Sequence, residues 1–97
     1  MVTDEIRRTA TPACRRFGVK RLEAFGSVAR GNAAASDVDL LVEFLDPDQD
    51  PARRFFGLLH ALEDGLGCDI DLLTSDSLRN PYFRARVMAE KVPVYEA

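Results

Sequence analysis

With 97 residues, 46% of them hydrophobic, the chain has room for one core only, so residues 1–97 are expected to form a single domain. The formal net charge of −3 argues against a protein that grips nucleic acid by its phosphates, which usually needs a basic face. No apolar run approaches the roughly 20 residues that span a bilayer, and the N-terminus lacks the apolar core of a signal peptide, so we expect a cytoplasmic protein without membrane contact.

The N-terminal segment is predicted to form a helix disturbed by a proline. Apolar residues recur at helical spacing from Ile6 to Phe17, and Gly18 stands where a helix commonly ends. Pro12 lies inside this pattern and would cost about 3 kcal/mol in a helix interior, unless Thr11 caps a new helix at that point. We therefore predict a helix that is kinked or restarted at Pro12.

Two strands and a short turn follow. Residues 19–25 are predicted to form a strand that ends at Gly26, after which Ser27 caps a short helical turn that reaches Arg30. Residues 38–44 form the second predicted strand.

The second half of the chain begins with another predicted helix. Asp50 is a candidate N-cap, and Pro51 suits the first turn. Apolar residues at helical spacing continue from there until Gly65 and Gly67, where we expect the helix to end.

The C-terminal third is predicted to contribute a strand, a helix and an edge strand. The strand covers residues 68–73, and Asn80 followed by Pro81 opens a helix that reaches about Glu90. Residues 92–95 can add an edge strand, where a proline is tolerated. The element order predicts an α+β fold in which helices pack against a small mixed β-sheet.

The residue pair Gly26-Ser27 is a candidate phosphate-binding turn. A strand that stops at glycine and turns into a helix start can aim backbone N–H groups and a serine hydroxyl at one anion. By itself such a pair is more often only a turn with a capped helix. Arg30 could touch a phosphate, or pair with a carboxylate such as Asp37 to hold the loop.

Two carboxylates follow this turn one residue apart. A strand has a side-chain period of two, so Asp37 and Asp39 point to one face while the residues between and after them point to the other. Mg²⁺ usually takes one or two carboxylates together with phosphate oxygens and water. Asp71 or Asp69, on the next predicted strand, could supply a third carboxylate for a site with two ions roughly 3.5–4 Å apart.

An Asp-x-Asp pair seen alone is more often a solvated strand end than a metal site. Here Asp37 and Asp39 stand at the entrance of a strongly apolar strand, where unneutralised charge is costly to desolvate. The Gly26-Ser27 turn upstream and the second Asp-x-Asp strand downstream favour the metal-binding interpretation. Mn²⁺ is an alternative to Mg²⁺, because both ions accept oxygen ligands.

The spacing of these motifs resembles that of the nucleotidyltransferase superfamily, which includes the catalytic domain of polymerase beta. The resemblance covers nearly the whole chain and is greatest to the minimal nucleotidyltransferases. It is carried by a set of short motifs: Gly26-Ser27, Ala29-Arg30-Gly31, Ser36-Asp37-Val38-Asp39, Cys68-Asp69-Ile70-Asp71-Leu72-Leu73-Thr74 and Val92-Pro93-Val94-Tyr95.

The resemblance implies a polymerase beta-like fold and a metal-dependent enzyme. Such an enzyme transfers a nucleoside monophosphate, here AMP from ATP, to an acceptor hydroxyl and releases pyrophosphate. Two Mg²⁺ ions are expected, held by Asp37, Asp39 and Asp71, and Asp71 is the candidate for activating the nucleophile. Residues assigned to nucleotide binding are Gly26, Ser27, Arg30 and Ser36.

Minimal proteins of this family are often antitoxins paired with a HEPN-type ribonuclease toxin. The resemblance therefore implies a hetero-oligomer in which the acceptor hydroxyl belongs to the toxin. Two alternatives stay open. One is a non-enzymatic antitoxin that acts by occlusion, and the other is a transferase that modifies a small molecule or an RNA end.

Overall fold

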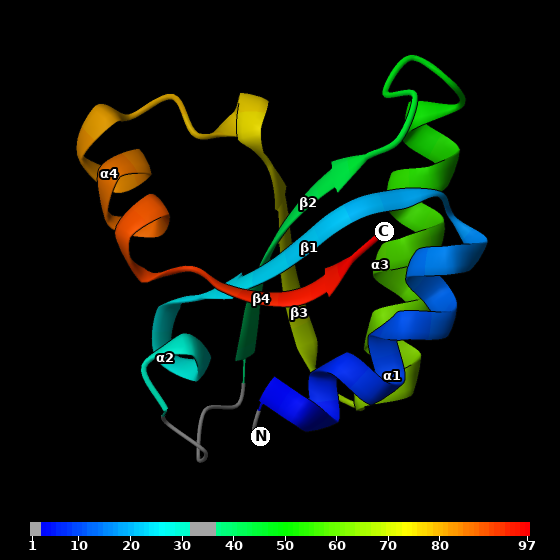
Figure 1. Cartoon of the computed structure of the whole chain (residues 1–97), viewed down its shortest axis with the longest axis horizontal. Coiled ribbons are helices and arrows are strands. Elements are labelled where there is room, and N and C mark those ends of the chain that lie inside the picture. Colours follow the sequence, from blue (N-terminus) through cyan, green and yellow to red (C-terminus); the bar gives the residue numbers. More distant parts are fainter. Residues whose placement is uncertain (1–2, 32–36) are drawn as a thin grey trace.

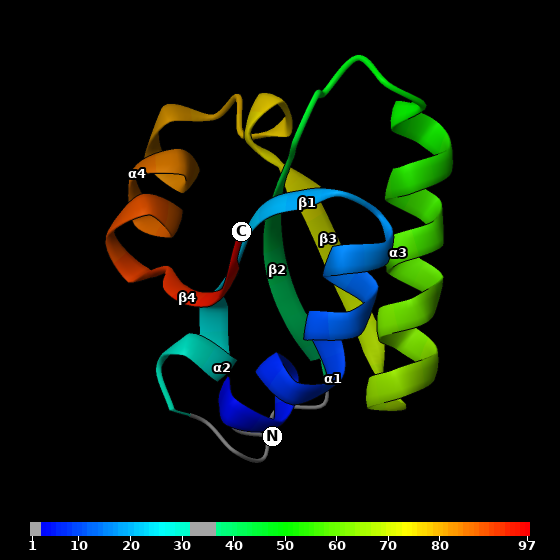
Figure 2. The same cartoon turned by 45° about the vertical axis from the view of Figure 1, so that its right-hand side comes forward.

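A computed structural model describes residues 3–31 and 37–97 and shows a four-stranded mixed sheet (Figures 1 and 2). Its order is β3-β2-β1-β4. β1 pairs antiparallel with both β2 and β4, whereas β2 and β3 run parallel. The strands are β1 (Val19–Phe25), β2 (Asp37–Phe44), β3 (Asp69–Thr74) and β4 (Val92–Glu96). The predicted α+β class and the predicted edge strand are confirmed.

Helices pack on both faces of this sheet. α1 (Thr3–Arg16) and α3 (Pro51–Leu66) lie together on one side, and α4 (Pro81–Glu90) lies on the other (Figure 1). The short helix α2 (Gly26–Ala29) follows β1, and a 3-10 turn, η1 (Ser75–Ser77), follows β3. In the part of the chain that the structure describes, no helix has the length and apolar character needed to cross a membrane.

The strand period of two divides the core between these helices. Val38, Leu40 and Val42 of β2 are buried in the main cluster, which includes residues of α1 and α3. Leu41 points the other way and packs with Val87 of α4 in a smaller cluster. The face below α4 therefore buries little apolar surface and leaves space for polar side chains.

α1 runs through Pro12 without a break, so the predicted restart is wrong. The Thr11 hydroxyl does not cap a new helix but donates to the carbonyl of Arg7 at 2.7 Å. Pro12 and Arg8 are both exposed, so water can satisfy the carbonyl that the proline leaves without a donor. The ribbon of α1 does change direction along its length (Figures 1 and 2).

The ends of α3 differ in part from the prediction. Asp50 occupies the N-cap position, but its side chain makes no capping hydrogen bond and its backbone is left-handed, with φ of 43°. Gly65 lies inside the helix and does not end it. Gly67, with φ of 66°, ends it as predicted, because glycine adopts this left-handed conformation without steric cost.

α4 begins as predicted, with Asn80 as its N-cap. The Asn80 side-chain oxygen accepts hydrogen bonds from the backbone N–H groups of Tyr82 at 2.9 Å and Phe83 at 3.2 Å. Replacing Asn80 with Ala is expected to lower the free energy of unfolding by about 1 kcal/mol, measured by urea denaturation, because two helix-end donors lose their acceptor. The control, Asn80→Asp, keeps an acceptor and should stay close to wild type. Equal losses in both variants would contradict the capping role.

Candidate active site

The parallel register of β2 and β3 places carboxylates side by side. Asp39 is opposite Asp71, and Asp37 is opposite Asp69. All four alternate with buried apolar residues, so they share the sheet face that α4 overlooks rather than the face covered by α1 and α3. The sequence-based expectation that Asp37 and Asp39 share a face agrees with this arrangement.

Asp39 and Asp71 lie side by side in the parallel register, and both line the same pocket. Burial raises the pKa of Asp39, and the contact with Asp71 and the negative charges of Asp71 and Asp37 raise it further. The guanidinium of Arg30 acts in the opposite direction. Two carboxylates held together in this way repel each other when both are ionised, which favours binding of a cation between them.

Gly26 brings the backbone directly against Asp39. Its φ is 72°, in the left-handed region, and a Cβ atom at this position would overlap the Oδ2 atom of Asp39. A residue with a side chain could therefore not keep this turn without displacing the carboxylate. α2 begins at Gly26, and Ser27 lies inside it, so the prediction that Ser27 caps this helix is wrong.

A pocket of about 420 Å³ collects most of the predicted site residues. Gly26, Ser27 and Arg30 line it from the α2 side, and Asp39 and Asp71 line it from the sheet. Asp37 and Asp69 are exposed and are not among its lining residues. Ser36, also predicted to contact the nucleotide, lies outside the described residues.

The wall of this pocket opposite the sheet comes from α4 and was not predicted from the sequence. It is formed by Phe83, Arg86, Val87 and Glu90. These positions share one helical face. The sequence pattern that could have indicated this wall is an apolar stripe interrupted by charged residues. Phe83 also packs edge-to-face on Phe25, with ring centroids 6.2 Å apart.

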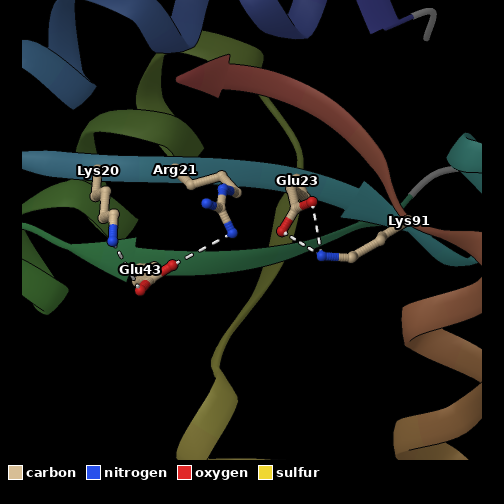
Figure 3. A network of polar contacts seen from close by, with 5 residues as sticks. All are labelled: Lys20, Arg21, Glu23, Glu43 and Lys91. Carbon is tan, nitrogen blue, oxygen red and sulfur yellow. Dashed lines mark hydrogen bonds and ion pairs between the residues drawn. The ribbon is translucent and has the colours of Figure 1, made fainter. Parts of the chain in front are cut away.

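Two ion pairs lie at the C-terminal end of α4. Arg30 donates to Glu90 at 3.0 Å, so the carboxylate partner of Arg30 is Glu90 rather than Asp37. Lys91, which follows the last residue of α4, contacts Glu23 of β1 at 2.9 Å (Figure 3). Both side chains of the Glu23–Lys91 pair are largely buried, whereas the contacts of Lys20 and Arg21 with Glu43 in the same view are exposed and contribute little.

The donor set fits a hard divalent cation. Among residues 3–31 and 37–97, no three carboxylate, histidine or cysteine side chains converge into a complete metal centre. Asp39 and Asp71 nevertheless supply two carboxylates on facing strands, which is the number Mg²⁺ commonly takes before substrate oxygens and water complete its shell. Asp37 lies close enough for its charge to affect Asp39.

A larger and mainly apolar hollow of about 840 Å³ lies at the other end of β2, near the start of α3. Phe55 and Phe56 line it. It contains none of the predicted site residues, and it lacks the facing carboxylates and the close glycine backbone. We therefore place the candidate active site in the smaller pocket.

Comparison with known proteins shows the family to which the chain belongs. The nucleotidyltransferase domain family matches residues 6–94. A candidate protein adenylyltransferase of Methanocaldococcus jannaschii is 38% identical over 95 residues, which cover 97% of this chain and 99% of that protein. The protein adenylyltransferase MntA of Thermococcus cleftensis is 42% identical over 67 residues, covering 67% of this chain and 65% of that one.

Solved structures show the same fold. The structure of a candidate minimal nucleotidyltransferase superposes with a TM-score of 0.76 at 35% identity and covers 96% of both chains. A chain from the complex of a tri-AMPylated Shewanella oneidensis HEPN toxin with an MNT antitoxin gives a TM-score of 0.68 at 17% identity, covering 99% of this chain and 74% of that one. At this lower identity the likeness concerns the fold alone. The family match and the relatives that span nearly the whole chain show that this protein belongs to the nucleotidyltransferase family and is a nucleotidyltransferase of the minimal type.

Proposed function

We propose that this protein, acting as one catalytic domain, transfers AMP from ATP to a hydroxyl group of a partner protein. The observation that carries this proposal is the pairing of Asp39 with Asp71 in register at the wall of a pocket that Gly26 also lines. This arrangement offers a cation site directly beside a backbone turn where a polyphosphate can lie. A surface that only binds a partner protein has no need for carboxylates that repel each other.

The nucleotide is proposed to bind between α2 and the sheet. The first N–H groups of a helix have no partner within it, and the small residues Gly26 and Ser27 let a phosphate approach them. Arg30 supplies a positive charge at the end of α2, and Ser36 is proposed to contact the nucleotide as well. A phosphate would have to compete with Glu90 for Arg30, because these two side chains form an ion pair.

Asp37, Asp39 and Asp71 are proposed to hold the divalent ions, two Mg²⁺ with Mn²⁺ as an alternative. When bound, these ions would neutralise negative charge on the triphosphate and lower the pKa of the attacking hydroxyl. Asp71 is proposed to accept the proton of that hydroxyl, which its exposure at the pocket wall supports. The acceptor oxygen then bonds to the α-phosphorus, and the bond from that phosphorus to pyrophosphate breaks.

The proposed partner is a HEPN-type toxin, which would make this protein the antitoxin of a hetero-oligomeric pair. Support comes from the relative named protein adenylyltransferase MntA and from the Shewanella oneidensis complex, whose HEPN toxin is tri-AMPylated and bound to an MNT antitoxin. A further structure of the same fold is a toxin-antitoxin complex with AMP-PNP, an ATP analogue. The base preference for adenine rests on these relatives.

The test is to incubate the protein with ATP, Mg²⁺ and a candidate HEPN partner, and to measure intact masses. We expect the partner to gain one or more AMP units and to gain none when Mg²⁺ is chelated. Inhibition of the partner's ribonuclease activity without any mass gain would contradict the enzymatic role and favour occlusion. Labelling of RNA ends or small molecules in place of the partner would contradict the proposed acceptor.

A further inference from the structure

The side of α4 that faces the pocket contains charged residues, which a helix face that only packs against a hydrophobic core would not need. Phe83, Arg86, Val87 and Glu90 occupy one helical face and all line the pocket, yet only Val87 is buried in a core cluster. A helix face directed at a protein core is normally an apolar stripe. Glu90 is accounted for by its ion pair with Arg30, but a charged Arg86 within such a stripe, on the wall facing Asp39 and Asp71, indicates contact with a polar ligand.

The pocket has two arginine side chains in its lining, Arg30 and Arg86, and they differ in their partners. Arg30 is already bound to Glu90 at 3.0 Å. Arg86 and Glu90 are four residues apart on the same helix, a spacing at which opposite charges commonly pair, but the carboxylate of Glu90 is turned to Arg30 instead. Among the described residues, Arg86 forms no ion pair, and its side chain is exposed beside the pocket.

We infer that Arg86 is a further nucleotide-binding residue, which contacts the polyphosphate of the nucleoside triphosphate from the α4 side of the pocket. This inference rests on the proposed function and adds a residue of α4 to its nucleotide site. The planar guanidinium of arginine donates hydrogen bonds in a fork that matches phosphate oxygens, and its charge persists at any physiological pH. Arg30 next to α2 and Arg86 of α4 would then both hold the triphosphate across the pocket from Asp39 and Asp71.

The test compares ATP and adenosine binding in the Arg86→Gln variant, measured by titration calorimetry in the absence of divalent ions. We expect ATP to bind about tenfold more weakly than to the wild type, which is about 1.4 kcal/mol, and adenosine to bind equally well. The affinity for ATP should also depend less steeply on salt concentration, because one phosphate contact is lost. Arg86→Lys should recover part of the ATP affinity, since it restores the charge without the fork.

Arg84→Gln is the matched control. Arg84 is an exposed arginine on the same helix, but it donates to the carbonyl of Ser75 at 3.2 Å and does not line the pocket. The control should bind ATP as the wild type does. Unchanged ATP binding by Arg86→Gln, or equal losses for ATP and adenosine, would overturn the inference while leaving the proposed function intact. Failure of the wild type to bind any nucleoside triphosphate, both without and with added Mg²⁺, would instead contradict the proposed function.

Discussion

Replacing Asp39 with Asn is expected to lower the rate of nucleotide transfer at least about 100-fold, measured with labelled ATP and the partner protein. Asp39 is half-buried, contacts Asp71 and lies against Gly26, so its carboxylate is central to the proposed cation site. The amide of asparagine keeps the shape of the side chain but loses the negative charge. Rate loss should therefore occur without loss of folding.

The same variant is expected to be slightly more stable than the wild type when divalent ions are chelated. The substitution removes the repulsion that raises the pKa of Asp39, and we expect a gain of at most about 1 kcal/mol, because both carboxylates remain partly in solvent. Stability contributed by Asp39 is complete below its ordinary pKa of 3.8 and is lost as pH rises through the raised pKa. Acidification across this window should therefore raise the stability of the wild type relative to that of the variant.

Asp69→Asn is the matched control for this prediction. Asp69 belongs to the same strand face as Asp71 but is exposed and does not line the pocket. Its substitution should leave the transfer rate within a few-fold of wild type. Retained transfer in Asp39→Asn, or equal loss in both variants, would contradict the assignment of Asp39.

Replacing Gly26 with Ala is expected to lower transfer by a similar factor, about 100-fold, and to destabilise the protein as well. A left-handed backbone costs a residue with a Cβ atom about 1–2 kcal/mol. The added Cβ would also overlap the Oδ2 atom of Asp39, so that the backbone turn or the carboxylate must move. Urea denaturation measures the first effect, and the transfer assay measures the second.

Gly67→Ala separates these two effects. Gly67 has φ of 66°, close to that of Gly26, but an added Cβ atom there would meet nothing within 4 Å. This control should lose a similar amount of stability from backbone strain and should keep normal transfer. A Gly26→Ala variant with a normal transfer rate would show that the close approach of this turn to Asp39 is not required.

Most elements could be predicted from the sequence, because their signals are local. Asn80 followed by Pro81 marks the start of α4, and the alternation through Asp37 and Asp39 places both on one face of β2. The wrong predictions applied a local rule at positions where the surrounding structure changes the outcome. Pro12 is tolerated because its missing hydrogen bond falls on an exposed side of α1, and Ser27 lies within α2 because the left-handed turn at Gly26 begins that helix one residue earlier.

The sequence by itself determined the kinds of element, the family resemblance and the identity of the candidate carboxylates. Only the tertiary structure decided that Asp39 meets Asp71 while Asp37 faces Asp69, and that α4 closes the pocket with Arg86 and Glu90. Side-chain periodicity is a property of one segment and can be read from its residues. The register between separate strands and the docking of a distant helix depend on which apolar surfaces pack together, and that choice involves the whole chain.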